Sequence, residues 1–133
     1  MSQADALTLE TAPGPRVLDD IAAVLSRAWS DNPSIPAAVR TYTEIAVGEI
    51  SANILEHATP GWIRLEVRVL ADQIQVDLFD DGRPTDVDLA AAALPDAMAE
   101  RGRGIALAKA SLELLSYRRD SVNHWTLVSK RFS

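Results

Sequence analysis

Four polar residues stand out in the mostly apolar segment 44–58: Glu49, Asn53, Glu56 and His57. The segment is typical of an α-helix, and at about 100° per residue these side chains project within roughly one third of its circumference. Burying carboxylates and an amide costs on the order of several kcal/mol unless the groups are paired or bound. The stripe therefore indicates a wet cavity or a metal site, although the solvent face of an amphipathic helix gives the same pattern.

A second candidate is Asp80, at the end of residues 73–80, where apolar and polar residues alternate. Counting by twos from Ile74 places Asp80 on the same inward face as the apolar residues of this expected strand. A carboxylate in that position needs a partner, which is water, a hydrogen-bond donor or a ligand. The pair Asp81-Gly82 that follows is, taken alone, typical of an ordinary turn.

A third candidate is the run Gly102, Arg103 and Gly104, which precedes apolar residues at helical spacing from Ile105 to Leu115. The sequence predicts a helix that opens at these glycines. The first amides of a helix have no partner within it and carry a partial positive charge, which suits phosphate oxygens. Taken alone, two glycines at this spacing more often mark only a loop.

The composition limits the fold and the class of partner. At 133 residues, of which 47% are hydrophobic, the chain suits a single domain over residues 1–133. The net charge of -6 and the pI near 4.8 argue against direct binding of nucleic acid or of an anionic membrane, since these partners require a basic face. The chain has no cysteine and no apolar run of the roughly 20 residues that cross a bilayer, and residues 1–10 show no basic region followed by an apolar segment. We therefore expect a cytoplasmic protein.

The elements that must position these residues follow from the periodicity of the apolar residues and from the turn residues between them. We expect an edge strand at 6–11, helices at 16–29 and from Pro36 or Ala37 to 57, an antiparallel hairpin of 62–70 and 73–80, a helix-prone lid within 85–101, the glycine-opened helix, and a closing hairpin of 117–120 and 123–132.

The candidate residues occur in a specific order along these elements: Glu49, Asn53 and His57, then Asp80, Gly82 and Pro84, then Gly102, Gly104 and Leu107. This order resembles the GHKL ATP-binding superfamily, over about residues 39–132. The compact form is similar to the anti-sigma-factor serine kinase branch, with an asparagine box and two glycine boxes. The resemblance implies an α+β fold, the two-layer α/β sandwich of the Bergerat type, with helices on one face of a mixed, mainly antiparallel sheet.

The resemblance also implies that the cofactors are ATP and Mg²⁺. Asn53 would coordinate Mg²⁺ through its side-chain oxygen, a hard ligand suited to this cation. Asp80 would accept a hydrogen bond from the exocyclic amine of adenine, and Gly82 would let the backbone approach the base. The other expected ATP contacts are Gly102 and Gly104 through lid amides around the phosphates, Arg101 or Arg103 through positive charge, Thr126 beside the adenine, and Pro84 and His57 through their places in the boxes.

Glu49 is the reason that we expect an enzyme and not only a binding protein. It lies one helical turn before Asn53 and so points toward the γ-phosphate region, where a general base accepts the proton of a serine or threonine hydroxyl. His57 has two interpretations, a residue that holds the helix end, which we favour, and a direct participant in the reaction. We expect Glu56 to be structural or solvated.

The resemblance leads to three hypotheses for the function. In the first, the protein is an anti-sigma regulatory factor with serine/threonine kinase activity, which binds a sigma factor and phosphorylates an antagonist protein of the STAS type. Such proteins commonly form homodimers. In the second it is a non-catalytic binding module gated by nucleotide, and in the third an interaction domain that has lost its nucleotide. The short, alanine-rich lid at 85–101 disfavours a large ATP-driven clamp.

Overall fold

The computed structural model describes residues 6–86, 88–89 and 100–132, with the backbone alone described for residues 100–102. The elements in chain order are β1 (Leu7–Thr11), α1 (Val17–Asp31), α2 (Ala37–Asn53), the π-helical turn η1 (Ile54–Ala58), β2 (Ile63–Val69), β3 (Ile74–Asp80), α3 (Glu100–Ser111), β4 (Leu114–Arg119) and β5 (Asn123–Val128). No helix within the described ranges is long and apolar enough to span a membrane.

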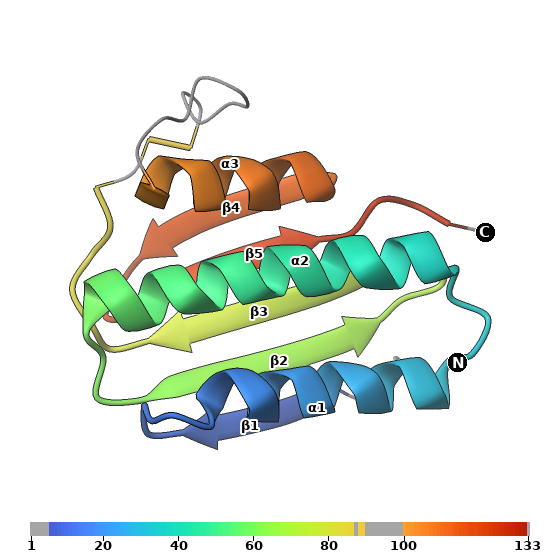
Figure 1. Cartoon of the computed structure of the whole chain (residues 1–133), viewed down its shortest axis with the longest axis horizontal. Helices are drawn as coiled ribbons and strands as arrows, with labels where there is room; N and C mark the ends of the chain where they lie inside the picture. Colours follow the sequence, from blue (N-terminus) through green and yellow to red (C-terminus); the bar gives the residue numbers. More distant parts are fainter. Residues whose placement is uncertain (1–5, 87, 90–99, 133) are drawn as a thin grey trace.

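The strands form one sheet in the order β1-β2-β3-β5-β4. Each neighbouring pair is antiparallel, so the sheet is antiparallel throughout the described strands and not mixed. The helices all lie on one face of this sheet (Figure 1), with α1 over β1 and β2, α2 over β3, and α3 over β4. This arrangement confirms the expected α+β fold with two layers.

The core lies between the helices and the sheet. Ile50 of α2, Leu78 of β3 and Trp125 of β5 are each at most 1% exposed. Removing apolar surface from water stabilises the folded chain by about 25 cal/mol per Å². The apolar stripe of α2 and the alternation of the strands therefore require the helix layer to cover one face of the sheet.

The strand register decides which face each polar residue occupies. On β3, Asp80 has the parity of the buried Leu78, whereas Asp77 has the opposite parity. β5 pairs Asn123 with Asp80 and Thr126 with Asp77. Because paired residues of antiparallel strands point to the same face, Asp80 and Asn123 lie on the helix-covered face. Asp77 and Thr126 lie on the other face.

α2 and η1 together form the long helix that the sequence predicts. The helix begins at Ala37, with Pro36 extended before it. Its last turn, η1, is widened to π-helical geometry, which is frequent at functional sites. Thr59 ends it in the left-handed conformation, with φ 46°, and Pro60 and Gly61 follow as the predicted stop.

Two boundaries differ from the sequence prediction. α3 begins at Glu100, so Gly102 and Gly104 lie within the helix and do not precede it. Leu115, expected on this helix, lies in β4 opposite Leu127 of β5. Strand pairing overrides the helical spacing here, because tertiary context outweighs a local pattern. Most of the lid expected within residues 85–101 lies outside the described residues, and the described positions between 85 and 89 are not helical.

Candidate functional site

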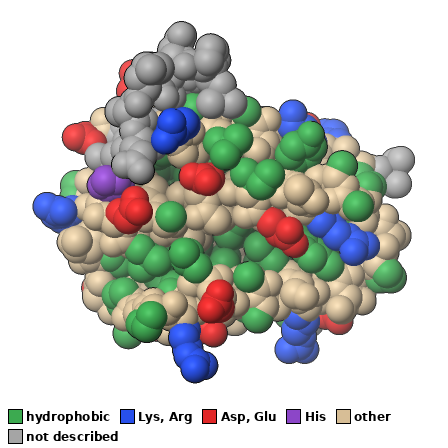
Figure 2. Space-filling view, viewed as in Figure 1, with side chains coloured by type: hydrophobic (Ala, Val, Ile, Leu, Met, Phe, Trp, Pro, Cys, Tyr) green, Lys and Arg blue, Asp and Glu red, His purple; other side chains and the backbone are tan. Residues whose placement is uncertain are grey.

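Two adjoining spaces meet at the end of α2. One is a cavity of about 10 Å³, which is room for about one water molecule. The other is a cleft of about 550 Å³ whose walls come from α2, η1 and α3. On the helix face, side chains of both charge signs and a histidine lie near the C-terminal end of α2 (Figure 2). Of the predicted site residues, the cavity is lined by Asn53, His57, Asp80 and Pro84, and the cleft by Glu49, Asn53, His57, Arg103 and Gly104.

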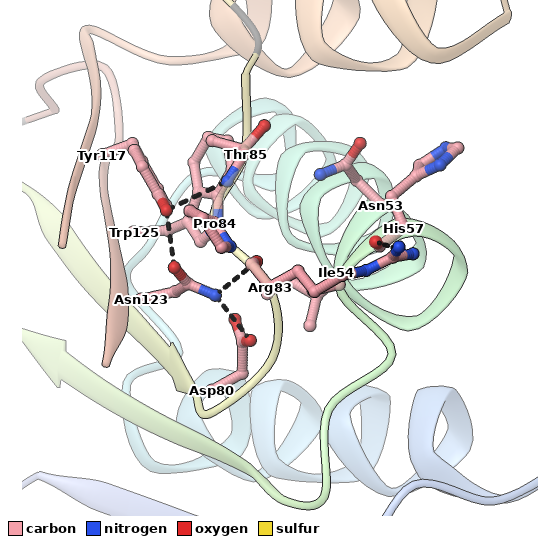
Figure 3. Close-up of a pocket in the computed structure, with 11 residues that line it drawn as sticks. Asn53, Ile54, His57, Asp80, Arg83, Pro84, Thr85, Tyr117, Asn123 and Trp125 are labelled. Atoms are coloured by element: carbon pink, nitrogen blue, oxygen red, sulfur yellow. Dashed lines mark hydrogen bonds between the residues drawn. The ribbon is translucent and has the colours of Figure 1, made fainter. Parts of the chain in front are cut away.

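Asn53 is the residue that joins the two spaces. It is the last residue of α2, it is 8% exposed, and its side chain lines both the cavity and the cleft. Figure 3 shows it beside His57, on the side of the cavity opposite Asp80. The structure therefore brings the polar stripe of the helix and the acid of β3 to a single site.

Asp80 lies at the end of β3 with no exposed surface. Its Oδ1 accepts hydrogen bonds from the amide of Gly82 at 2.8 Å and from Nδ2 of Asn123 at 2.9 Å. Its Oδ2 is buried and has no hydrogen-bond partner among the described residues. Burial raises the pKa of this carboxyl, against the lowering effect of the two hydrogen bonds. A buried acceptor beside a cavity is suited to a donor group on a bound molecule.

Asn123, at the start of β5, orients Asp80. It is 1% exposed, and besides the bond to Asp80 its Nδ2 donates to the carbonyl of Arg83 at 2.9 Å. Its Oδ1 accepts from the hydroxyl of Tyr117 at 2.5 Å and from Nη1 of Arg119 at 2.8 Å. Because both ends of the amide are bonded, Asn123 connects β3 to β4 and fixes the direction of the carboxylate.

Residues 83–85, here called the strap, run across the small cavity (Figure 3). On one side the amide of Arg83 donates to the carbonyl of Ala58 in η1 at 2.8 Å. On the other side the amide of Thr85 donates to the hydroxyl of Tyr117 in β4 at 3.1 Å. The strap is thus tied to both walls of the cavity.

Gly82 packs against η1. A Cβ at this position would lie 2.3 Å from the carbonyl oxygen of Ala58, closer than any real contact. Glycine is therefore required where the turn after β3 meets the helix end backbone to backbone. The approach of this backbone to a base stays a prediction.

Glu49 is half-buried on the wall of the cleft, where α3 approaches α2. A Cβ on Gly104 would lie 2.6 Å from Oε1 of Glu49. Gly104 therefore leaves room for the carboxylate between the two helices. Since only the first four amides of a helix lack partners within it, Gly104, the fifth residue of α3, is poorly placed to offer its amide to phosphate.

The remaining predicted residues of the cleft are Arg103, His57, Arg101 and Gly102. Arg103 is exposed and lines the cleft. The backbone carbonyl of His57 accepts from Nη2 of Arg83 at 3.1 Å, and the role of its imidazole stays a prediction. Arg101 and Gly102 lie in the first turn of α3, and their side-chain positions fall outside the described residues.

Thr126 is not part of this site, contrary to the prediction. Its hydroxyl donates to Oδ1 of Asp77 at 3.0 Å, and the same oxygen lies 2.7 Å from Nε2 of His124. These residues lie on the face of the sheet away from the helices. The residue of β5 that reaches the cavity is Asn123, which is three positions earlier and so of opposite parity.

The sequence reasoning missed Asn123 and Tyr117. The signal for Asn123 was present, since it shares the parity of Trp125 and Leu127, the large apolar residues of the same expected strand. An asparagine on the inward face of a strand is uncommon enough to mark a site. Tyr117 carried no such signal, because its partner lies in the strap, 32 residues away.

A comparison with protein families agrees with this fold and site. Residues 12–130 match the model of the histidine kinase-like ATPase domain. The match covers nearly the whole chain and includes every residue of the cavity and the cleft described above. No curated protein matches the chain. The chain therefore belongs to the histidine kinase-like ATPase domain family, within the GHKL superfamily.

Proposed function

We propose that the protein is an ATP- and Mg²⁺-dependent serine/threonine protein kinase that acts as an anti-sigma regulatory factor. In this proposal it binds a sigma factor and phosphorylates a STAS-type antagonist on a serine, which changes the amount of free sigma factor. ATP binding follows from the family. The choice of a kinase is supported by Glu49 and Asn53, which line one cleft beside the cavity at Asp80.

The observation that carries the proposal is the buried, unpartnered Oδ2 of Asp80. The exocyclic amine of adenine is a hydrogen-bond donor and would satisfy this acceptor, whereas guanine presents a carbonyl oxygen at the same place. The site is therefore suited to adenine. The cavity beside Asp80 holds about one water molecule, so the strap or Tyr117 must move before a purine can enter.

Asn53 is the residue in position to hold Mg²⁺. Its amide oxygen is a hard ligand, and Mg²⁺ commonly takes one or two protein ligands together with substrate phosphates and waters. No group of three histidine, aspartate or glutamate side chains that could hold a metal ion is found within the described ranges. When bound, the ion neutralises charge that develops on the phosphates.

Glu49 supplies the general base of the proposed reaction. Its carboxylate accepts the proton of the serine hydroxyl while the hydroxyl oxygen forms a bond to the γ-phosphorus. The bond from this phosphorus to the bridging oxygen breaks, and ADP leaves with the electron pair. Arg103, on the cleft wall, adds positive charge near the phosphates. Most of the rate enhancement comes from positioning and charge, with the base adding about 10²–10⁴-fold.

Transfer of labelled phosphate from ATP to purified STAS-domain proteins tests this function. We expect Glu49→Gln to lower transfer by about 10²–10⁴-fold while Mg²⁺·ATP affinity stays nearly unchanged. Glu56→Gln is the matched control, because Glu56 lines the same cleft with a side chain that is 71% exposed. Undiminished transfer by the Glu49 variant would exclude Glu49 as the base. ATP binding without transfer to any candidate would favour the alternative, a binding module gated by nucleotide.

A further inference from the structure

The two parts of the site differ in size. The cleft of about 550 Å³ is within the roughly 300–1,000 Å³ that ligand pockets occupy. The cavity beside Asp80, at about 10 Å³, is about the size of one water molecule. Phosphate groups therefore have space beside Asn53, whereas the space next to Asp80 is too small for a base.

The closure comes from the strap and from Tyr117. Pro84 and Thr85 line the cavity together with the ring of Tyr117 (Figure 3). The hydroxyl of Tyr117 accepts from the amide of Thr85 at 3.1 Å and donates to Oδ1 of Asn123 at 2.5 Å. The ring is held at a centroid distance of 4.8 Å from that of Trp125. One hydroxyl therefore bonds both to the strap and to the residue that orients the buried acid.

The bond between Tyr117 and the strap can break without disturbing Asp80. Oδ1 of Asn123 also accepts from Nη1 of Arg119 at 2.8 Å, so the amide keeps its orientation when the tyrosine hydroxyl leaves. The bond from Asn123 to Asp80 uses the other end of the amide. The site for the base thus stays organised when the Thr85 end of the strap is released, while Arg83 stays bonded to Ala58 and Asn123.

We propose that Tyr117 is a latch that holds the strap across the purine site, and that nucleotide enters only after the Thr85 amide leaves the Tyr117 hydroxyl. The proposal rests on the proposed function for its nucleotide, but it does not depend on phosphate transfer. If the open form is the minor one, the apparent dissociation constant equals that of the open form divided by the fraction of open molecules. The latch therefore sets both the rate of nucleotide entry and the apparent affinity.

Stopped-flow binding of Mg²⁺·ATP with a fluorescent group on the ribose tests the latch in the full chain. When opening limits entry, the observed rate reaches a plateau as nucleotide concentration increases. We expect Tyr117→Phe to raise this plateau about two- to tenfold, the change in rate that the net free energy of one hydrogen bond gives. Tyr42→Phe is the matched control, since Tyr42 is 46% exposed and does not line the cavity.

The outcomes separate the latch from the function on which it rests. An unchanged plateau, or slower and weaker binding by Tyr117→Phe, overturns the latch while nucleotide binding stands. Absence of nucleotide binding by the wild type and both variants overturns the proposed function as well. If Tyr117→Phe does not fold, hydrogen exchange at the Thr85 amide of the wild type decides, since the latch requires that nucleotide lower its protection.

Discussion

Adjacent carboxylates at Asp80 and Asp81 are held in opposite environments. Burial raises the pKa of Asp80, since its carboxyl has no exposed surface and one oxygen without a partner. The pKa of Asp81 is lowered, chiefly by a hydrogen bond from the amide of Trp62 at 3.0 Å, with another from the amide of Gly61 at 2.7 Å. Asp80 is thus available for recognition, whereas Asp81 fixes the loop before β2.

These directions predict opposite effects of pH on two variants. The stability from Asp81 is present above the pKa of the unfolded carboxyl and is lost as pH falls through the lower folded value. We therefore expect Asp81→Asn to be less stable than the wild type at neutral pH, with the difference disappearing in acid. The pKa of Asp80 is raised in the folded state, so the wild type loses stability as pH rises through that value. We therefore expect the free energy of unfolding of Asp80→Asn to increase relative to that of the wild type with increasing pH.

Urea unfolding from about pH 3 to about pH 8, a range that spans the ordinary carboxyl pKa values, measures both differences. Asparagine keeps one acceptor oxygen in each place but replaces the other oxygen with a donor, so the change of each difference with pH, and not its absolute size, reports the charge. Curves for the two variants that run parallel to the wild type would show that neither environment perturbs its carboxyl.

At the level of single residues, the sequence predicted the inward position of Asp80 but not its partner. Counting by twos along β3 was sufficient to predict that Asp80 points inward, because the side chains of a strand alternate between its two faces. The same count on β5 places Asn123 and Trp125 on the inward face and Thr126 on the outward face. The resemblance to the superfamily nevertheless favoured Thr126. Local geometry was the better guide here, since a slip of one residue moves a side chain to the other face.

The contact between α2 and α3 governs the position of the proposed base. Because Gly104 lacks a Cβ, Oε1 of Glu49 occupies the space between the helices. Gly104→Ala forces this flexible carboxylate to shift, while the backbone of both helices stays in place. A displacement of about 1 Å in a reacting group costs up to about 10²-fold in rate. We expect phosphate transfer to fall by about 10–10²-fold, with a much smaller change in Mg²⁺·ATP affinity.

Gly48→Ala is the matched control for this prediction. Gly48 lies on α2 next to Glu49, and a Cβ there would meet nothing within 4 Å. Alanine in a helix interior stabilises by about 0.5–1 kcal/mol relative to glycine, so this variant should gain stability and keep full transfer activity. Equal activity of the Gly104→Ala variant and the wild type, measured in the same transfer assay, would show that Glu49 does not need this space.

At the level of elements, the sequence predicted the long helix, the β2–β3 hairpin and the edge position of β1 because each carries a clear period. The start of α3 was not predictable in this way, since two glycines near a helix start are also typical of the loop before it. The structure includes them in the helix, where their cost of about 1 kcal/mol each is offset by the close packing of Gly104 on α2. The spacing of residues along one segment does not predict this contact between two helices.

The candidate site lies where α2, η1 and α3 meet β3, β4 and β5. Asn53 comes from α2, Asp80 from β3, Gly104 from α3 and Asn123 from β5, so residues from distant parts of the chain meet only when the sheet has formed. Periodicity predicts each element separately but not how they are paired. The convergence was predictable only from the resemblance to the superfamily, which supplies the topology.

A ligand that contacts so many elements should stabilise the molecule as a unit. A ligand at about 100 times its dissociation constant adds about 2.7 kcal/mol to the free energy of unfolding when it binds only the folded state. For a domain of this size that corresponds to a rise in Tm of about 8–11 °C. We expect Mg²⁺·ATP to produce this rise in the wild type, measured by calorimetry at saturating nucleotide.

The proposed recognition of the base by Asp80 predicts that this thermal shift is selective. In the Asp80→Asn variant the acceptor facing the adenine amine is replaced by a donor in one orientation of the amide, while the other orientation sacrifices the bonds to Gly82 and Asn123. We therefore expect Mg²⁺·ATP to raise the Tm of this variant by no more than about 1–2 °C, and Mg²⁺·GTP to do the same for the wild type. An equal shift with ATP and GTP would mean that the phosphates alone are bound in the open cleft. In that case the buried acid would serve the fold and not the recognition of a base.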